Sequence, residues 1–257
     1  MSLLSNAKSD SNINDEKDTV GGNYGPKESG LYPVTVSMAY LEKSQGGAVA
    51  VNLTLKPQDG SGEIRQKLWI VSGDAKGNKN YYEKDGERFY LPGFNTANSL
   101  ALLTLGKEIG EVDTEEKIVN VWSFDAKAEV PTKVEVLMEL LDQEILVGIQ
   151  KQVVDKQVRQ DDGSYAPNGE TREQNEIDKF FRLSDRMTTA EIKAGATSPE
   201  FCNTWDKKWT GVTRDRTTNA SANAGQSGAP AAAAAANSSG NSGASTGNRS
   251  SLFAGSQ

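Results

Sequence analysis

The sequence predicts a mainly β fold with a few helices, arranged as an antiparallel barrel between two polar tails. Apolar residues alternate with a period of two over several runs, and glycine-containing turns separate these runs. Helical spacing is confined to three short segments. The two ends are mostly small and polar residues, which bury too little surface to offset the entropy of ordering. We therefore expect a disordered N-terminal arm over residues 1–29, one domain over residues 30–213 and a low-complexity flexible tail over residues 214–257.

The first half of the domain predicts three successive strands. Alternation begins after Gly30, and the residues that we expect on one face of the first strand are Tyr32, Val34, Val36, Met38 and Tyr40. A turn at residues 45–47 leads to a second alternating run, residues 49–56. A turn at residues 57–62 leads to a third run, residues 64–71. Strands joined by short turns of this kind form an antiparallel meander.

The third strand has two chemically different faces. Ile64, Leu68 and Ile70 point one way together with Gln66, whereas the opposite face carries Arg65, Lys67 and Trp69. Cations can meet phosphate oxygens and an indole can stack on a base, so this face could hold single-stranded nucleic acid. The alternative is that the cations are ordinary solvated side chains and that Trp69 covers a loop.

A polar segment over residues 73–93 follows, and it combines rings with cations. Its length and composition indicate either a functional loop or a loop that its rings hold on the surface. Together with the third strand it supplies the nucleic-acid-binding residues that we predict: Arg65, Lys67, Trp69, Lys76, Lys79, Tyr81, Tyr82, Arg88, Phe89 and Tyr90. Trp122 and Phe124 either extend this platform or fill the core. Their alternation with Val119 and Val121 leaves both alternatives open, with a slight preference for the core.

The second half of the domain predicts one helix and further strands. A helix capped by Asn95 or Thr96 precedes strands over residues 117–124, 133–140 and 144–158, a mobile loop over residues 159–176 and a strand over residues 177–183. The strands over residues 133–140 and 144–158 are predicted to pair as a hairpin, because the link between them is short and polar. The order of three strands, a helix and these two paired strands is that of an OB-fold barrel, to which residues 117–124 add a strand. Thr188 and Glu191 have capping-box spacing, and a last helix carries the stripe Phe201, Trp205 and Trp209, which we expect to dock on the barrel as a lid.

Composition excludes most kinds of catalysis. The chain of 257 residues contains no histidine, which removes the commonest general base and most zinc sites. Cys202 is its single cysteine, so it has no internal disulfide partner and no histidine to activate it. Neither a glycine-rich nucleotide-binding motif nor a metal-ligating spacing of carboxylates is present. We therefore expect no enzyme, no cofactor and no metal.

Charge and hydropathy limit the partners. The net charge of −7 argues against strong adhesion to duplex DNA, but a local basic strip with stacking rings still permits single-strand binding. No apolar run approaches the roughly 20 residues that span a bilayer, and the N-terminus lacks the pattern of a signal peptide. We expect no membrane partner. A lone cysteine is compatible with a reducing cytoplasm.

Several short motifs resemble the single-stranded DNA-binding proteins of tailed bacteriophages. They are Gly30-Leu31-Tyr32, Leu91-Pro92-Gly93, Phe181-Arg182-Leu183, and Thr189-Ala190-Glu191-Ile192 followed by Phe201 and Trp205, together with the low-complexity tail. This resemblance, over about residues 30–210, implies an OB fold that coats single-stranded DNA in the cytoplasm of an infected bacterium. It also implies partners from replication, recombination or transcription.

The tail departs from that family in its charge. Such proteins often end in an acidic tip, but residues 217–257 carry one charge, Arg249. An apolar tip, Leu252 and Phe253, would have to recruit partners in its place.

We interpret the chain as a sequence-tolerant single-stranded DNA-binding protein without enzymatic activity, and its oligomeric state stays open. The first alternative is a virion or assembly protein whose β-rich module carries a polar spacer tail. The second is a carboxylate enzyme such as a metal-dependent nuclease.

Overall fold

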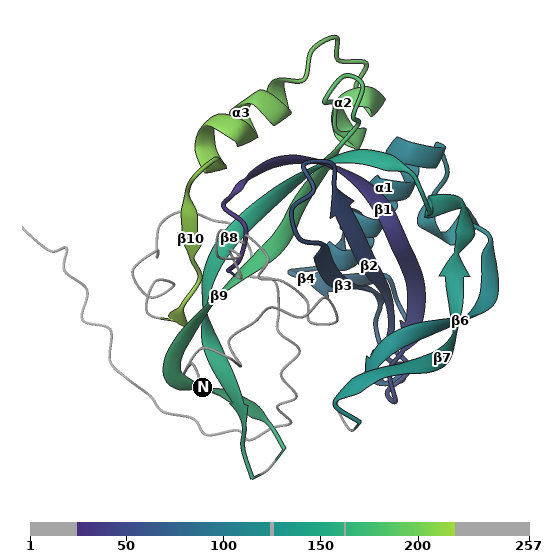
Figure 1. The fold of residues 1–257 in the computed structure, drawn as a ribbon, viewed down its shortest axis with the longest axis vertical. Helices are drawn as coiled ribbons and strands as arrows, with labels where there is room; N and C mark the ends of the chain where they lie inside the picture. Colours follow the sequence, from purple (N-terminus) through teal and green to yellow (C-terminus); the bar gives the residue numbers. More distant parts are fainter. Residues whose placement is uncertain (1–24, 124–125, 162, 219–257) are drawn as a thin grey trace, which may run out of the picture.

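The computed structural model describes residues 25–123, 126–161 and 163–218, and it confirms the mainly β class with a few helices. One large, strongly curved sheet wraps around helix α1 (Pro92–Leu105), and the short helices α2 (Thr189–Lys193) and α3 (Glu200–Trp209) cover one end (Figure 1). Among the described helices, none is both long enough and apolar enough to cross a membrane. Most of the predicted arm and tail lies outside the described residues.

Strands β1 (Gly30–Lys43), β2 (Val49–Pro57) and β3 (Ile64–Val71) form the predicted antiparallel meander. The predicted faces of β3 agree with the burial of its residues. Ile64, Leu68 and Ile70 are buried in the core, whereas Trp69 is exposed. Alternation alone therefore gave the correct orientation for this strand.

The predicted face of β1 is wrong after Val36, because the strand contains a β-bulge. Val36 pairs with Leu55 and Met38 pairs with Thr54, so Ser37 is an extra residue on the β1 side. A bulge shifts the alternation of all later side chains by one position. Met38 and Tyr40 consequently lie on the side opposite Val34 and Val36, while Ala39 takes the inward position and is fully buried.

Helix α1 packs against the inner faces of the sheet through four buried residues, Ala97, Leu100, Ala101 and Leu103. It begins at Pro92, earlier than the cap predicted at Asn95 or Thr96, since proline suits the first turn of a helix. Gly93 allows the close approach of α1 to β3. A Cβ atom there would lie 2.3 Å from the carbonyl oxygen of Trp69.

Two long strands complete the sheet. Strands β8 (Glu144–Arg159) and β9 (Tyr165–Phe181) form a hairpin, and β8 pairs with the first half of β1, from Gly30 to Thr35. The loop predicted over residues 159–176 is therefore mostly strand. The sequence did not reveal this strand because its side chains are mostly polar and do not alternate with apolar ones. Backbone hydrogen bonds to β8 hold it in place. A short strand, β10 (Thr213–Asp215), runs parallel to β8.

The strand order β3-β2-β1-β8, with β9 beside β8, is the order expected for an OB-type barrel, but the barrel is not closed. Within the described part of the chain, β3 and β9 share no backbone ladder. They are linked instead by the side-chain oxygen of Gln66, which accepts a hydrogen bond from the backbone N–H of Ile177.

A second hairpin, the ribbon, leaves the sheet at the other half of β1. It consists of β6 (Thr114–Ser123) and β7 (Ala128–Leu137), and β7 pairs with β1 only at Tyr40 and Leu41. The predicted hairpin of residues 133–140 with 144–158 is therefore wrong, because β7 pairs with β6 and β1 whereas β8 pairs with β1, β9 and β10. The ribbon curves away from the sheet on the side opposite the β8–β9 hairpin (Figure 1).

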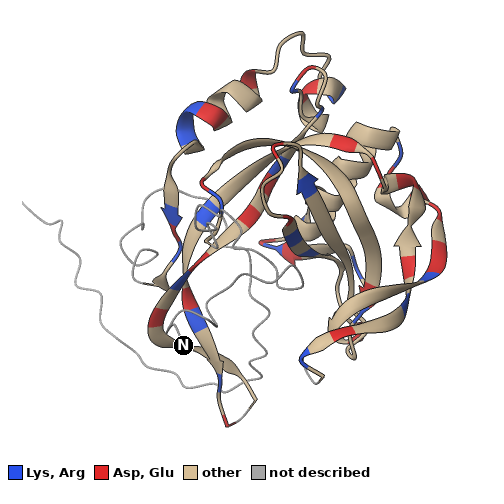
Figure 2. Ribbon diagram, viewed as in Figure 1, with Lys and Arg blue, Asp and Glu red and all other residues tan. Residues whose placement is uncertain are grey.

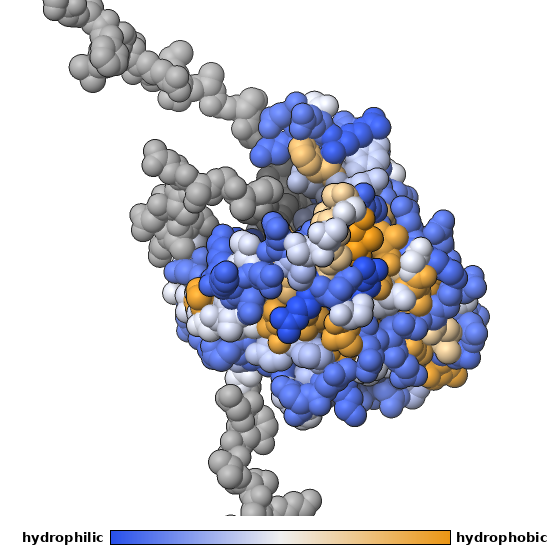
Figure 3. Space-filling view, turned by 90° about the horizontal axis from the view of Figure 1, so that it is seen from above, coloured by the Kyte–Doolittle hydropathy of each residue, from blue (hydrophilic) through white to orange (hydrophobic). Residues whose placement is uncertain are grey.

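Helix α3 docks on the sheet as predicted, but only through part of its stripe. Trp205 is 3% exposed, packs with Leu146, Phe181 and Cys202, and donates its indole N–H to Asp178 at 2.6 Å. Phe201 remains 45% exposed. The predicted capping box of Thr188 and Glu191 is present at the start of α2. The surface seen from above this end is mainly hydrophilic, with small apolar patches between polar residues (Figure 3).

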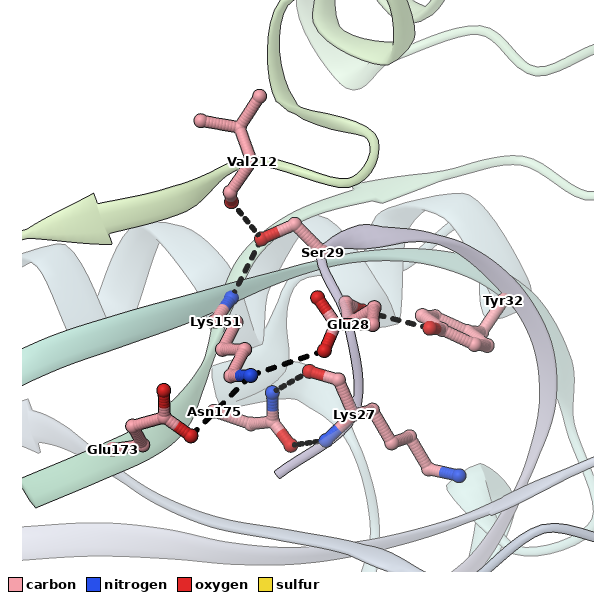
Figure 4. Close-up of polar contacts among 8 residues, drawn as sticks. All are labelled: Lys27, Glu28, Ser29, Tyr32, Lys151, Glu173, Asn175 and Val212. Carbon is pink, nitrogen blue, oxygen red and sulfur yellow. Dashed lines mark hydrogen bonds and ion pairs between the residues drawn. The ribbon is translucent and has the colours of Figure 1, made fainter. Parts of the chain in front are cut away.

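Lys27, Glu28 and Ser29, assigned from the sequence to the arm, are bonded to the domain (Figure 4). The Ser29 hydroxyl donates a hydrogen bond to the carbonyl oxygen of Val212 and accepts one from the backbone N–H of Lys151. The Asn175 side chain exchanges two hydrogen bonds with the Lys27 backbone, both of 2.8 Å. These bonds join the start of the described chain to β8, β9 and the segment after α3.

Candidate nucleic-acid interface

The side of β1, β2 and β3 that faces away from the core carries a small grid of side chains, which we call the outer face. Its members lie in three rows across the strands: Glu42, Ala50 and Trp69; Tyr40, Asn52 and Lys67; Met38, Thr54 and Arg65. Directly paired residues project from the same side of a sheet. The three predicted residues of β3 therefore share one surface with two residues of β1, Met38 and Tyr40, that the sequence had assigned to the opposite side.

Lys67 and Trp69 form the centre of the outer face. The Lys67 ammonium lies 5.6 Å from the centre of the Trp69 ring, and Trp69 is 43% exposed. An exposed indole beside a cation can stack on a base while the cation meets the adjoining phosphate.

Glu42 already pairs with the Lys67 cation. The Lys67 ammonium lies 2.7 Å from one Glu42 oxygen, and the Asn52 amide donates to the other at 3.0 Å. Partial burial raises the pKa of the Glu42 carboxyl, but the hydrogen bonds from Lys67 and Asn52 and the Lys67 charge outweigh it, so this pKa lies below its ordinary value. Glu42 is therefore charged at neutral pH and would compete with a phosphate for Lys67.

Arg65 has two carboxylate neighbours. Its guanidinium lies 3.0 Å from Glu63 and 4.0 Å from Glu129 at the far end of the ribbon. Exposed ion pairs of this kind contribute only about 0–1 kcal/mol, so a phosphate can replace either carboxylate at little cost. Figure 2 shows that acidic and basic residues are interleaved along the strands. Binding at this surface would depend on stacking at least as much as on charge.

The segment over residues 73–93 is not a loop, because it contains the hairpin of β4 (Tyr81–Lys84) and β5 (Glu87–Tyr90). Tyr81 pairs with Tyr90 on one face of this hairpin, and Tyr82 pairs with Phe89 on the other. The four predicted rings therefore do not form a single platform. The hairpin is tied to the end of β3 by the N–H of Ser72, which donates to the Lys79 carbonyl at 2.8 Å.

Two of the predicted cations lie close to the ring of Tyr81. Lys79 and Arg88 lie 5.2 Å and 5.1 Å from the centre of the Tyr81 ring, and Arg88 also pairs with Glu83 at 3.2 Å. Lys76 is exposed in the single helical turn Asp74–Lys76 that precedes the hairpin. Lys76 and Lys79 make no ion pair with any described residue, so both cations are available to a phosphate.

The structure also adds residues to the site. Tyr40 and Met38 reach the outer face through the bulge, for which the sequence gives no clear signal. Asn52 and Thr54 were recognisable as the polar side of the second strand. Trp122 is 52% exposed, so of the two alternatives left open the one in which it fills the core, slightly preferred from the sequence, is wrong. Phe124, Leu252 and Phe253 lie outside the described residues.

The chemistry available elsewhere is limited. Cys202 is fully buried, and burial raises the pKa of its thiol, which disfavours the reactive thiolate. Within the described ranges, no group of three or more cysteine and carboxylate side chains is placed to hold a metal ion.

Comparison with known proteins adds no assignment. No protein-family model matches the chain, and the search of curated proteins found no significant match.

Proposed function

We propose that the chain binds single-stranded DNA without sequence preference and that the outer face is the binding surface. The observation that carries this proposal is the exposed Trp69 indole beside Lys67, on the β2–β3 side of a meander with OB-type strand order. In OB folds this is the face that takes up oligonucleotides. Stacking is worth about 1–3 kcal/mol per base for every type of base, which explains tolerance of sequence.

The proposed role is to coat and protect single strands during phage DNA replication, recombination or transcription, in the cytoplasm of the infected host. The resemblance of the short motifs to phage single-stranded DNA-binding proteins supports this context. The tail residues Leu252 and Phe253 would recruit a protein of one of these processes. Catalysis is not part of the proposal.

Trp69→Ala and Lys67→Ala separate stacking from charge in a fluorescence titration with oligo-dT at several salt concentrations. Trp69→Ala should weaken binding by about 1–3 kcal/mol and leave the salt dependence nearly unchanged. Lys67→Ala should reduce the slope of log K against log salt by about 0.7, the value for one phosphate contact on a single strand.

Helix α3 supplies matched controls away from the outer face. Phe201 is similarly exposed, and Lys208 lies 5.0 Å from the Trp209 ring, much as Lys67 lies over Trp69. Phe201→Ala and Lys208→Ala should bind as the wild type does. Wild-type affinity in Trp69→Ala and Lys67→Ala, or a complete lack of oligonucleotide binding by the wild type, would refute the proposed function.

A further inference from the structure

Trp122 is a large apolar side chain that the fold leaves half exposed. It lies on β6 of the ribbon and is 52% exposed, although tryptophan is highly buried on average in folded proteins. Exposed tryptophan is enriched where proteins make energetically important contacts. Its position therefore suggests a ligand rather than a structural role.

The register of the ribbon relates Trp122 to the outer face. Trp122 pairs directly with Glu129 of β7, so the two side chains project from the same side of the ribbon. The Glu129 carboxylate lies 4.0 Å from the Arg65 guanidinium. The side of the ribbon that reaches Arg65 is therefore the side that carries Trp122.

The ribbon is also attached to the strand that carries Tyr40. Val136 of β7 pairs with Tyr40, and Tyr40 pairs with Asn52 on the outer face. The ribbon is thus attached to β1 by a backbone ladder at its root, and its far end reaches Arg65 of the outer face through an ion pair.

The groups then follow one another in an order that suits a single strand. Trp69, Lys67 and Arg65 are spaced two residues apart on β3, which places Trp69 and Arg65 about 13 Å apart along the strand. Beyond Arg65 comes the ribbon with Trp122. The order is ring, cation, cation, ring, so bases could stack at both ends while the phosphates between them meet the cations.

We propose that Trp122 is a second base-stacking residue, which holds the bases of a single strand that extends past Arg65 from the outer face. This inference rests on the proposed function and adds a residue from a different element. A phosphate would take the place of the Glu129 carboxylate at Arg65.

The test is the dependence of affinity on oligonucleotide length in Trp122→Ala. Oligo-dT series from about 4 to 16 nucleotides, the range of OB-fold site sizes, are titrated against wild type, Trp69→Ala and Trp122→Ala. Trp122→Ala should bind the longer oligonucleotides about 5- to 150-fold more weakly, the fold-change that corresponds to one stacked base. It should bind the shortest oligonucleotides that still require Trp69 as tightly as the wild type does.

Ile118→Ala is the matched control, because Ile118 is 75% exposed on the same side of the same strand but has no ring. This variant should bind every length normally. If Trp122→Ala matches wild type at every length while Trp69→Ala is impaired, the inference is wrong and the proposed function stands. Equal losses of affinity in Trp122→Ala and Ile118→Ala would also overturn it, because the loss would then come from a general effect on the ribbon and not from the missing indole ring. A wild type that binds no oligonucleotide would refute both.

Discussion

Each cation of the outer face is held beside a carboxylate. Lys67 pairs with Glu42, and Arg65 pairs with Glu63 and Glu129. In a chain with a net charge of −7, these carboxylates keep the outer face from attracting every polyanion. They also reduce the electrostatic share of the affinity for a single strand, because each phosphate must first displace one of them.

Glu42→Gln should therefore strengthen oligo-dT binding. The amide keeps an acceptor for Asn52 but no longer neutralises Lys67. The gain should be at most about 1 kcal/mol, the upper range for an exposed ion pair, and should shrink as salt rises. Titrations at low and high salt measure it. Glu200→Gln on α3 is the charge-matched control, and an equal gain in that variant would attribute the effect to net charge alone.

The sequence alone predicted some of the residues of the outer face but not all of them. The orientation of Arg65, Lys67 and Trp69 followed from alternation because β3 is regular through them. Met38 and Tyr40 were misplaced because a bulge changes the pairing without changing the pattern of apolar residues. The exposure of Trp122 depends on how the ribbon curves, which its alternating sequence does not record.

Among the elements, the strands with one apolar face were predictable, and the polar hairpins were not. Residues 165–176 and the β4–β5 hairpin are held largely by backbone ladders, and their side chains are mostly polar or exposed on both faces. Patterns of side-chain burial cannot reveal such strands. The contact between α1 and β3, in turn, depends on one glycine whose role appears only in three dimensions.

Gly93→Ala should destabilise the protein, because the added Cβ would lie 2.3 Å from the carbonyl oxygen and 2.7 Å from the nitrogen of Trp69. Both are backbone atoms, so α1 or β3 must shift. The expected loss is about 1–3 kcal/mol in the free energy of unfolding, as for other overpacked sites. Urea denaturation measures it. Gly110→Ala, where nothing lies within 4 Å of the added atom, is the control and should lose much less.

At the scale of the whole molecule, the segment before β1 joins parts of the chain that are distant in sequence, namely β8 and the residues after α3. Ser29 is 2% exposed, and its hydroxyl bonds to both Lys151 of β8 and Val212 after α3. Lys151 also pairs with Glu28 at 3.0 Å and with Glu173 of β9 at 3.3 Å (Figure 4). The sequence did not predict these bonds, because the segment lacks apolar residues.

Ser29→Ala should lower the free energy of unfolding by about 1–3 kcal/mol, since it removes both hydrogen bonds of the buried Ser29 hydroxyl, to the Lys151 N–H and to the Val212 carbonyl. Thermal and urea denaturation would both report the loss. Ser37→Ala removes an exposed serine whose hydroxyl bonds to the Thr54 carbonyl at 3.0 Å, and it should cost within about 0.5 kcal/mol. Similar costs for the two variants would contradict the role assigned to Ser29.

The bulge at Ser37 has one more consequence. It marks the point where β1 changes partner, since residues up to Thr35 pair with β8 and Tyr40 and Leu41 pair with β7. The β8–β9 hairpin and the ribbon are thus both attached to a single strand, and an unfolding event that frees β1 releases the two hairpins together. An oligonucleotide bound over β1 would bind only the state in which both hairpins are attached. It should therefore protect both hairpins against opening, including the β8–β9 hairpin, which it does not contact.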